Sequence, residues 1–273
     1  MDLILEKQDL TYLEWSRVRH SSGTAGSFLK AETELGAAKI YYKLSNYDSL
    51  HGVVGHECVN ELIVDRLLTV LGIEHLHYQL IHADILVDGK QIETYLCASE
   101  NFRKSGEEKI ALEDYYEMEK TPEDKDPFVF CVNRGWGDYI CRMLVVDYLI
   151  LNRDRHGANI EVLRNSKTRM VRLAPLFDHG LSLLAPCRTE AEIAAFDVMK
   201  NRRIQSFVGS QSAEDNLRLI PKDGFPELNA LRETDREKLL AGLDGVIPEL
   251  LLNKIWEMIW RRWQHYEDLR HRG

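Results

Sequence analysis

The stretch that most constrains the fold is Asp154-Arg155-His156-Gly157-Ala158-Asn159, followed downstream by Leu176-Phe177-Asp178-His179-Gly180. Two short apolar runs separated by a polar turn connect these motifs, so we expect a β-hairpin between them. A hairpin returns the chain to the edge from which it left, and would bring Asn159 and Asp178 to the same end of adjacent strands. Asp154 and Asn159 have the D-x-x-x-x-N spacing of a kinase catalytic loop.

These residue types are the ones that phosphoryl transfer requires. One carboxylate, Asp154, would orient or deprotonate an attacking hydroxyl, while the Asp178 carboxylate and the Asn159 amide oxygen would hold Mg²⁺ on nucleotide phosphates. Each residue by itself also has a structural explanation, as a turn cap, a turn residue or a strand end. The combination with upstream residues favours the catalytic interpretation.

The upstream sequence offers a phosphate-binding segment and a lysine. The segment comprises Ser22, Gly23, Thr24, Ala25, Gly26 and Ser27, where small residues allow backbone N–H groups to approach phosphate. A strand predicted at 38–44 carries Lys39 and Lys43, which alternation does not separate because both face the same side. We favour Lys43, since it lies at the far end of the strand.

An amphipathic helix predicted from about Gly55 to Gly72 offers a carboxylate partner for that lysine. Glu57, Glu61 and Asp65 recur at every fourth position and therefore share one face of this helix. One of them can point into a cleft and pair with Lys43. The alternative from periodicity alone is a solvated acidic face.

At these residues the chain resembles the HipA-like serine/threonine kinases, and in size their compact, CtkA-like members. The catalytic loops of that family read D-x-H-x-x-N or D-R-H-x-x-N, as residues 154–159 do here. The stretch 60–73 is similar to the family's N-E-x-…-L-G-L helix, which gives Glu61 the place of the lysine-pairing glutamate. His179 replaces the Phe of D-F-G, so a Phe-based switch is not expected.

The resemblance, which spans about residues 21–184, implies an α+β, protein-kinase-like and phosphatidylinositol-kinase-like fold with two lobes. The N-lobe, 1–101, would hold an antiparallel sheet and one helix, and the C-lobe, 102–273, would be mainly helical. ATP and Mg²⁺ would be the cofactors, and a protein Ser or Thr the acceptor. His156 would brace Asp154 or Asp178 by hydrogen bonding. The family also implies self-inhibition by autophosphorylation of the glycine-rich loop, and a toxin–antitoxin setting with an antitoxin-like partner.

Three other functions stay open at this point. A lipid or small-molecule kinase would use the same residues, with a basic run facing an anionic acceptor. That run comprises Lys200, Arg202 and Arg203. A pseudokinase would bind without turnover, although no catalytic position is lost. A metal phosphohydrolase would leave Lys43 and Glu61 without a purpose. Its metal ligands would be Asp154, His156, Asp178 and His179.

Composition narrows the class of protein. The 273 residues include 35 Lys+Arg against 44 Asp+Glu, and this net charge of −9 argues against non-specific nucleic-acid binding. No run approaches the ~20 apolar residues of a membrane-spanning helix, and the charged N-terminal segment does not match a signal peptide, so we expect a cytoplasmic protein. Scattered cysteines without a C-x-x-C spacing predict buried, reduced thiols. They are Cys58, Cys97, Cys131, Cys141 and Cys187.

Patterning in the rest of the chain predicts five features. A hairpin should turn at Asp88-Gly89, a solvated helix and loop should occupy 103–127, and a helix should precede the catalytic loop. The region after Gly180 reads mostly as helix. A final helix from about Pro248 should bury a stripe of Trp256, Trp260 and Trp263.

Overall fold

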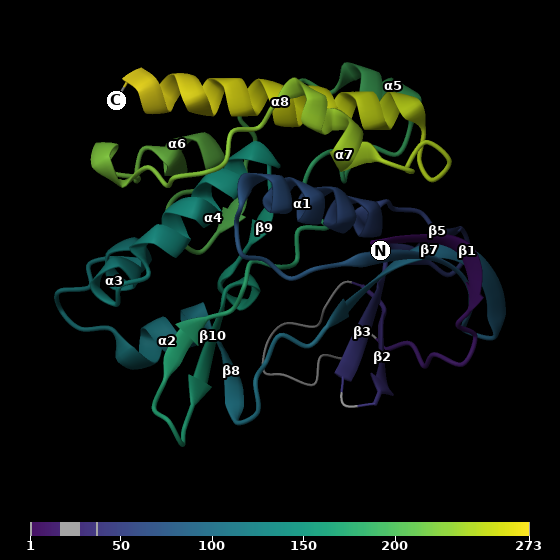
Figure 1. Cartoon of the computed structure of the whole chain (residues 1–273), viewed down its shortest axis with the longest axis horizontal. Coiled ribbons are helices and arrows are strands. Elements are labelled where there is room, and N and C mark those ends of the chain that lie inside the picture. The colour runs from purple at the N-terminus through teal and green to yellow at the C-terminus, as the bar shows by residue number, and fades with distance from the viewer. Residues whose placement is uncertain (1, 17–27, 37, 273) are drawn as a thin grey trace.

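The computed structural model describes residues 2–16, 28–36 and 38–272, and its fold combines a sheet with helices (Figure 1). The main sheet has five strands in the order β1-β6-β7-β3-β2. Its strands are β1 (Leu3–Asp9), β2 (Lys30–Leu35), β3 (Ala38–Leu44), β6 (Gln79–Val87) and β7 (Lys90–Glu100). β1 pairs parallel with β6 and the other pairs are antiparallel. The sequence pattern does not predict β1, because only three apolar residues precede its charged and polar half and its partner lies more than seventy positions away.

The hairpin between β6 and β7 forms as predicted. Asp88 and Gly89 have φ angles of 50° and 76°, and Val87 pairs with Lys90 across the turn. Two successive residues with positive φ suit the right-handed twist of the strands that they join. A smaller pair of strands, β4 (Tyr47–Asp48) and β5 (Gly52–Val53), precedes the first long helix.

Helix α1 (Glu57–Leu71) occupies the predicted position and contacts β3, β6 and β7. It ends at Gly72, whose φ of 72° lets its N–H reach the carbonyls of Leu68 and Thr69. Leu62 and Leu67 of this helix join the larger hydrophobic cluster, which also contains residues of the later helices such as Ile259. A second, smaller cluster contains Leu44 and Ile85 of the sheet. Helix α1 is therefore held between the sheet and residues far along the chain.

The segment 103–127 contains the predicted, mostly exposed helix and loop, and in addition a strand that the sequence did not predict. It contains β8 (Glu107–Ala111), which joins β10 (Glu161–Asn165) and β11 (Val171–Leu173) in a second sheet, and then α2 (Leu112–Glu119). Two of the three charged residues of β8 are paired across this sheet: Glu107 contacts Arg172 at 2.8 Å, and Lys109 contacts Glu161 at 3.0 Å. A charged segment forms a strand here because its partners come from the predicted hairpin, which composition does not reveal.

The remaining helices are α3 (Pro127–Asn133), α4 (Gly137–Leu149), α5 (Glu190–Ala195), α6 (Ala213–Leu217), α7 (Arg236–Leu240) and α8 (Glu249–Arg272). The prediction of mostly helix after Gly180 is wrong, since short helices and 3₁₀ turns alternate with irregular chain before α8. The predicted final helix is confirmed. Trp256 and Trp263 are buried, while Trp260 is half-buried and stacks on Trp256 with ring centres 5.8 Å apart. No helix in the described ranges combines the length and apolar character needed to cross a bilayer.

Candidate active site

The loop predicted to be catalytic follows α4 and is built around the buried side chain of Arg155. This loop contains β9 (Asp154–Arg155), which pairs with β12 (Gln205–Ser206), and a 3₁₀ turn at Gly157–Asn159. The Arg155 guanidinium forms an ion pair with Asp147 of α4 at 3.0 Å. It also donates to the backbone carbonyls of Asn159 and Phe177, each at 3.0 Å. Arg155 thus connects the Asn159 turn with the residue that precedes Asp178.

Sequence reasoning missed this role of Arg155. The only signal in the sequence is its position inside the D-R-H motif, since an arginine in a polar loop is more often exposed. Its partner Asp147 lies on the buried side of α4, where it also accepts a hydrogen bond from Asn152 at 2.9 Å. The charge of Arg155 is sustained in the interior because it is paired and hydrogen-bonded.

The Asn159 side chain is buried and leaves one strong acceptor without a partner. Its Nδ2 donates to the Asp154 carbonyl at 2.8 Å, and this hydrogen bond orients the amide. Its Oδ1 is buried and accepts no hydrogen bond from the described residues. A buried amide oxygen without a partner is costly, so an unmet acceptor at this position fits a group that binds a hard cation.

The ammonium of Lys43 joins the upstream and downstream parts of the site. Its Nζ lies 2.9 Å from Glu61 Oε1 on α1 and 2.5 Å from Asp178 Oδ1. Burial opposes the charge on Lys43, but the carboxylates of Asp178 and Glu61 outweigh burial and raise its pKa well above the usual value. Lys43 is therefore positively charged inside the site, as a phosphate-binding lysine must be.

Glu61 and the Asp178-His179-Gly180 segment hold each other in place. The backbone N–H of His179 donates to Glu61 Oε2 at 2.8 Å, and Asn60 Nδ2 donates to the Gly180 carbonyl at 2.9 Å. A Cβ on Gly180 would lie 3.2 Å from Glu57 Cβ and 3.3 Å from Glu61 Oε1. The glycine of this motif is thus explained by the close approach of α1.

The three acidic residues on one face of α1 are all buried, so the alternative of a solvated acidic face is wrong. Glu57 pairs with Arg188 at 3.2 Å, while Asp65 accepts the backbone N–H of Tyr78 at 2.6 Å. Glu61 is the one that contacts Lys43. Arg188 lies 131 positions after Glu57, and Lys43 and Tyr78 also lie outside the helix, so periodicity within α1 did not show that this face is buried.

The two candidate lysines of β3 occupy different environments. Lys39 pairs with Glu32 of the neighbouring strand at 2.7 Å, whereas Lys43 reaches the site.

The glycine-rich segment lies outside the described residues. This segment comprises Ser22, Gly23, Thr24, Ala25, Gly26 and Ser27. Just after it, the Phe28 ring centre lies 4.9 Å from Lys43 Nζ, and Lys30 pairs with Lys43 in the sheet.

His156 lies beside Asp154, with its Nε2 3.7 Å from Asp154 Oδ1. Its Nδ1 accepts the backbone N–H of Ala158 at 3.2 Å. The imidazole therefore adjoins Asp154, one of the two carboxylates that it was expected to brace. Tyr78, another residue that the sequence did not point to, accepts the backbone N–H of Asp178 on its hydroxyl at 3.3 Å.

The ligand set of a metal phosphohydrolase is not assembled. No three of its four side chains bring their ligand atoms within 4.8 Å of one another. The four residues are Asp154, His156, Asp178 and His179. His179 is buried, and burial lowers its pKa well below the usual value.

In the basic run of Lys200, Arg202 and Arg203, the Arg202 guanidinium carbon lies 4.2 Å from the ring centre of Phe196.

The chain was compared with protein families, curated proteins and solved structures. No protein-family model matches the chain. Over 121 residues the chain is 32% identical to the serine/threonine-protein kinase CtkA of Helicobacter pylori strain J99, a match that covers 43% of this chain. The matched segment spans 35% of the length of that curated relative.

Solved structures extend the likeness to the whole fold. The crystal structure of the H. pylori proinflammatory kinase CtkA matches with a TM-score of 0.66 at 16% identity, covering 97% of both chains. HipA from a Shewanella oneidensis MR-1 toxin–antitoxin complex with HipB and operator DNA scores 0.42 at 16% identity, over 89% of this chain and 57% of that one. The resemblance to the compact, CtkA-like kinases is confirmed: the chain is similar to CtkA in sequence and has its fold.

Proposed function

We propose that this chain is a HipA-like kinase that transfers the γ-phosphate of ATP to a protein Ser or Thr hydroxyl in the presence of Mg²⁺. The observation that carries the proposal is the contact of Lys43 with both Glu61 and Asp178, next to a loop with the D-x-x-x-x-N spacing. The name of its relative CtkA, a serine/threonine-protein kinase, supports the same activity.

Each polar group of the site has a role in this proposal. Lys43 would bind the α- and β-phosphates, and Glu61 would keep its ammonium in position. Asn159 Oδ1 and the Asp178 carboxylate would hold Mg²⁺, consistent with the unmet acceptor on Asn159. When bound, Mg²⁺ would offset the negative charge on the phosphates.

Asp154 would orient the acceptor hydroxyl and accept its proton, and His156 would keep the Asp154 carboxylate in place. We place ATP between an N-lobe of residues 1–101 and a C-lobe of residues 102–273, with the glycine-rich segment over the phosphates. Phosphorylation of that segment by the enzyme itself would add about −1.5 to −2 charge beside the phosphates and would repel ATP. The setting proposed is the cytoplasm, with a protein substrate and an antitoxin-like partner.

The decisive experiment is transfer of label from γ-labelled ATP with Mg²⁺, using the wild-type chain, Asp154→Ala and the control Asp223→Ala, which changes an exposed aspartate elsewhere. We expect Asp154→Ala to lower the transfer rate by about 10² to 10⁴, because a positioned acid–base group contributes that much. ATP affinity should change little in both variants, since Asp154 would act on the acceptor. Intact mass reports phosphate on the chain itself.

The distribution of label separates this proposal from the others. Label on protein Ser or Thr supports it, and label on lipid or a small molecule supports the alternative acceptor. ATP binding without turnover would indicate a pseudokinase, and free phosphate alone a phosphohydrolase. Full activity of Asp154→Ala would remove Asp154 from the mechanism.

A further inference from the structure

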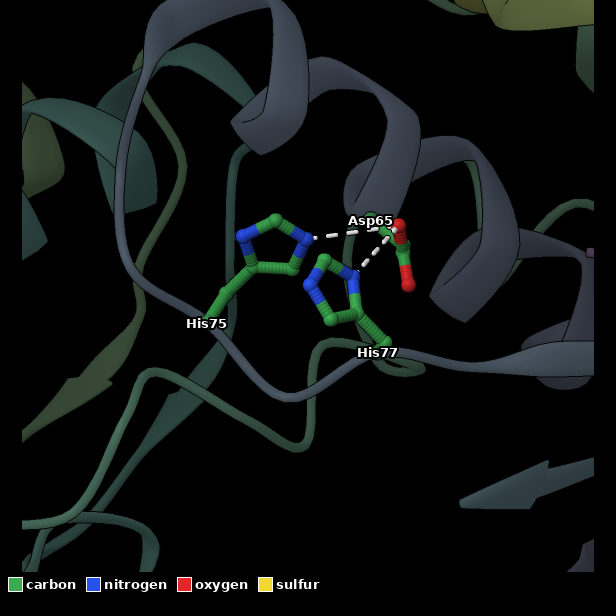
Figure 2. A group of neighbouring side chains, drawn as sticks. All are labelled: Asp65, His75 and His77. Atoms are coloured by element: carbon green, nitrogen blue, oxygen red, sulfur yellow. Dashed lines mark hydrogen bonds and ion pairs between the residues drawn. The ribbon is translucent and has the colours of Figure 1, made fainter. Parts of the chain in front are cut away.

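Three side chains of the kind that bind transition metals meet beside the second half of α1 (Figure 2). Asp65 lies on α1, and His75 and His77 lie on the segment that connects α1 with β6. Asp65 Oδ1 is 3.3 Å from His75 Nε2 and 3.5 Å from His77 Nδ1. None of the three takes part in the proposed phosphoryl transfer.

The His75 ring nitrogen that faces Asp65 lies in a buried environment that favours a positive charge. Its Nδ1 lies 2.7 Å from the carbonyl oxygen of Ile73, which can only accept, so Nδ1 carries the proton. In the neutral ring Nε2 is then a lone pair, and it faces the Asp65 carboxylate. The His75 side chain is only 4% exposed, and its Nε2 is buried and has no hydrogen-bond partner among the residues that the structure describes. Two acceptors that face each other in the interior repel unless a positive charge, either a bound metal ion or a second proton on the imidazole, lies between them.

We propose that Asp65, His75 and His77 form a site for Zn²⁺. Ligand atoms about 2.0–2.1 Å from a tetrahedral zinc lie about 3.3–3.4 Å from one another, close to the two separations found here. Two imidazole nitrogens favour zinc over magnesium or calcium, which prefer oxygen ligands. The His77 side chain is 77% exposed, so the ion can enter from solvent and keep a water as fourth ligand.

The supporting hydrogen bonds are those of a metal site. A zinc-bound histidine usually donates its other ring N–H to a carbonyl or carboxylate, as His75 Nδ1 does to Ile73. A ligating carboxylate is in turn hydrogen-bonded through its second oxygen, as Asp65 Oδ2 is by the N–H of Tyr78 at 2.6 Å. Two of the three ligands are therefore already oriented by the backbone.

The position of the site gives the ion a structural role. Leu76, between the two histidines, donates its N–H to the carbonyl of Leu176 at 2.8 Å, two residues before Asp178. Asp65 lies one helical turn after Glu61 on α1. Zinc would thus fasten α1 to the segment that runs beside Asp178, and binding should stabilise the folded chain.

The test uses the full chain, stripped with a chelator and then titrated with ZnCl₂ without nucleotide. Zinc content, competition with a chromogenic chelator and the absorption spectrum of the Co²⁺ form are measured. His77→Ala alters an exposed residue, and Asp65→Asn keeps the side-chain shape. The matched control is His51→Ala, because His51 is 73% exposed and lies 2.8 Å from Asp48 without a third ligand.

We expect one zinc per chain, a tetrahedral Co²⁺ spectrum and a higher melting temperature with zinc. Both His77→Ala and Asp65→Asn should weaken zinc binding about tenfold or more, and His51→Ala should leave it unchanged. Wild-type protein that retains no zinc, or equal affinity in the wild type and His77→Ala, would overturn the proposal. Because no readout involves ATP, the result stands apart from that of the kinase assay.

Discussion

The negative charge of Asp178 has two partners in the proposed function, the Lys43 ammonium and Mg²⁺. Its carboxylate contacts Lys43 at 2.5 Å, and in the proposed function it also holds Mg²⁺ with Asn159. Lys43 has a second carboxylate partner in Glu61, so it would stay charged without Asp178. The contribution of Asp178 to metal binding can therefore be separated from its contribution to the charge of the lysine.

We predict that Asp178→Asn weakens the affinity for Mg-ATP about tenfold or more, because the substitution removes a full negative charge from a hard-cation site while keeping its shape. ATP without Mg²⁺ should bind about as well as to the wild type. Calorimetric titrations with and without Mg²⁺ measure both affinities. If the variant binds Mg-ATP as tightly as the wild type, Asp178 is not a metal ligand.

At the scale of the element, the loop of residues 154–159 is joined to the helix before it by a buried ion pair. The side chains of Arg155 and Asp147 are 0% and 5% exposed. Removing one member of such a pair leaves an uncompensated charge in the interior, which usually costs about 3–5 kcal/mol. An exposed pair such as Arg218 with Asp215 contributes about 0–1 kcal/mol.

We accordingly expect Arg155→Met to lower the free energy of unfolding by about 3–5 kcal/mol, because Asp147 stays buried without its cation. Arg218→Met is the matched control and should change it by no more than about 1 kcal/mol. Urea denaturation measures both. Equal stability of the two variants would mean that the loop does not need the buried guanidinium.

For the molecule as a whole, acid should reduce stability through a histidine at the start of α1. Burial lowers the pKa of His56 from 6.5 to about 4 in the folded chain. Between these pH values the unfolded chain binds a proton that the folded chain does not bind. The contribution of His56 is thus fully present above about pH 6.5 and is lost as the pH falls toward 4.

We predict that the free energy of unfolding falls more steeply with decreasing pH in the wild type than in His56→Asn, by about 3 kcal/mol in total at about 1.4 kcal/mol per pH unit. Asn is a favoured residue at a helix start, so α1 should not suffer from the substitution. Denaturation in chelator-containing buffer at about pH 7 and about pH 5 should show about 2 kcal/mol of this difference, because only about 1.5 pH units of the interval are crossed. His51→Asn, an exposed control, should behave as the wild type; parallel curves for His56→Asn and wild type would contradict the prediction.

Short-range patterns predicted much of this molecule. Helix α1 and its end at Gly72, the β6–β7 turn at Asp88-Gly89 and α8 follow from periodicity and glycine conformation, which act over a few residues. The candidate site residues were also visible as motifs, because phosphoryl transfer restricts both the residue types and their spacing.

What the sequence by itself determined, then, were the local elements and the identity of the polar groups Lys43, Glu61, Asp154, Asn159 and Asp178. Only the tertiary structure decided which charged groups are buried and with whom. The acidic residues Glu57, Glu61 and Asp65 on one face of α1 are buried. Arg155 is also buried, and the charged strand β8 pairs with β10. The pairs of Glu57 with Arg188 and of β8 with β10 join positions distant in the sequence, whereas Asp147 lies only eight residues before Arg155 but on another element, α4. The free energy of a buried charge depends on such partners rather than on its immediate neighbours along the chain.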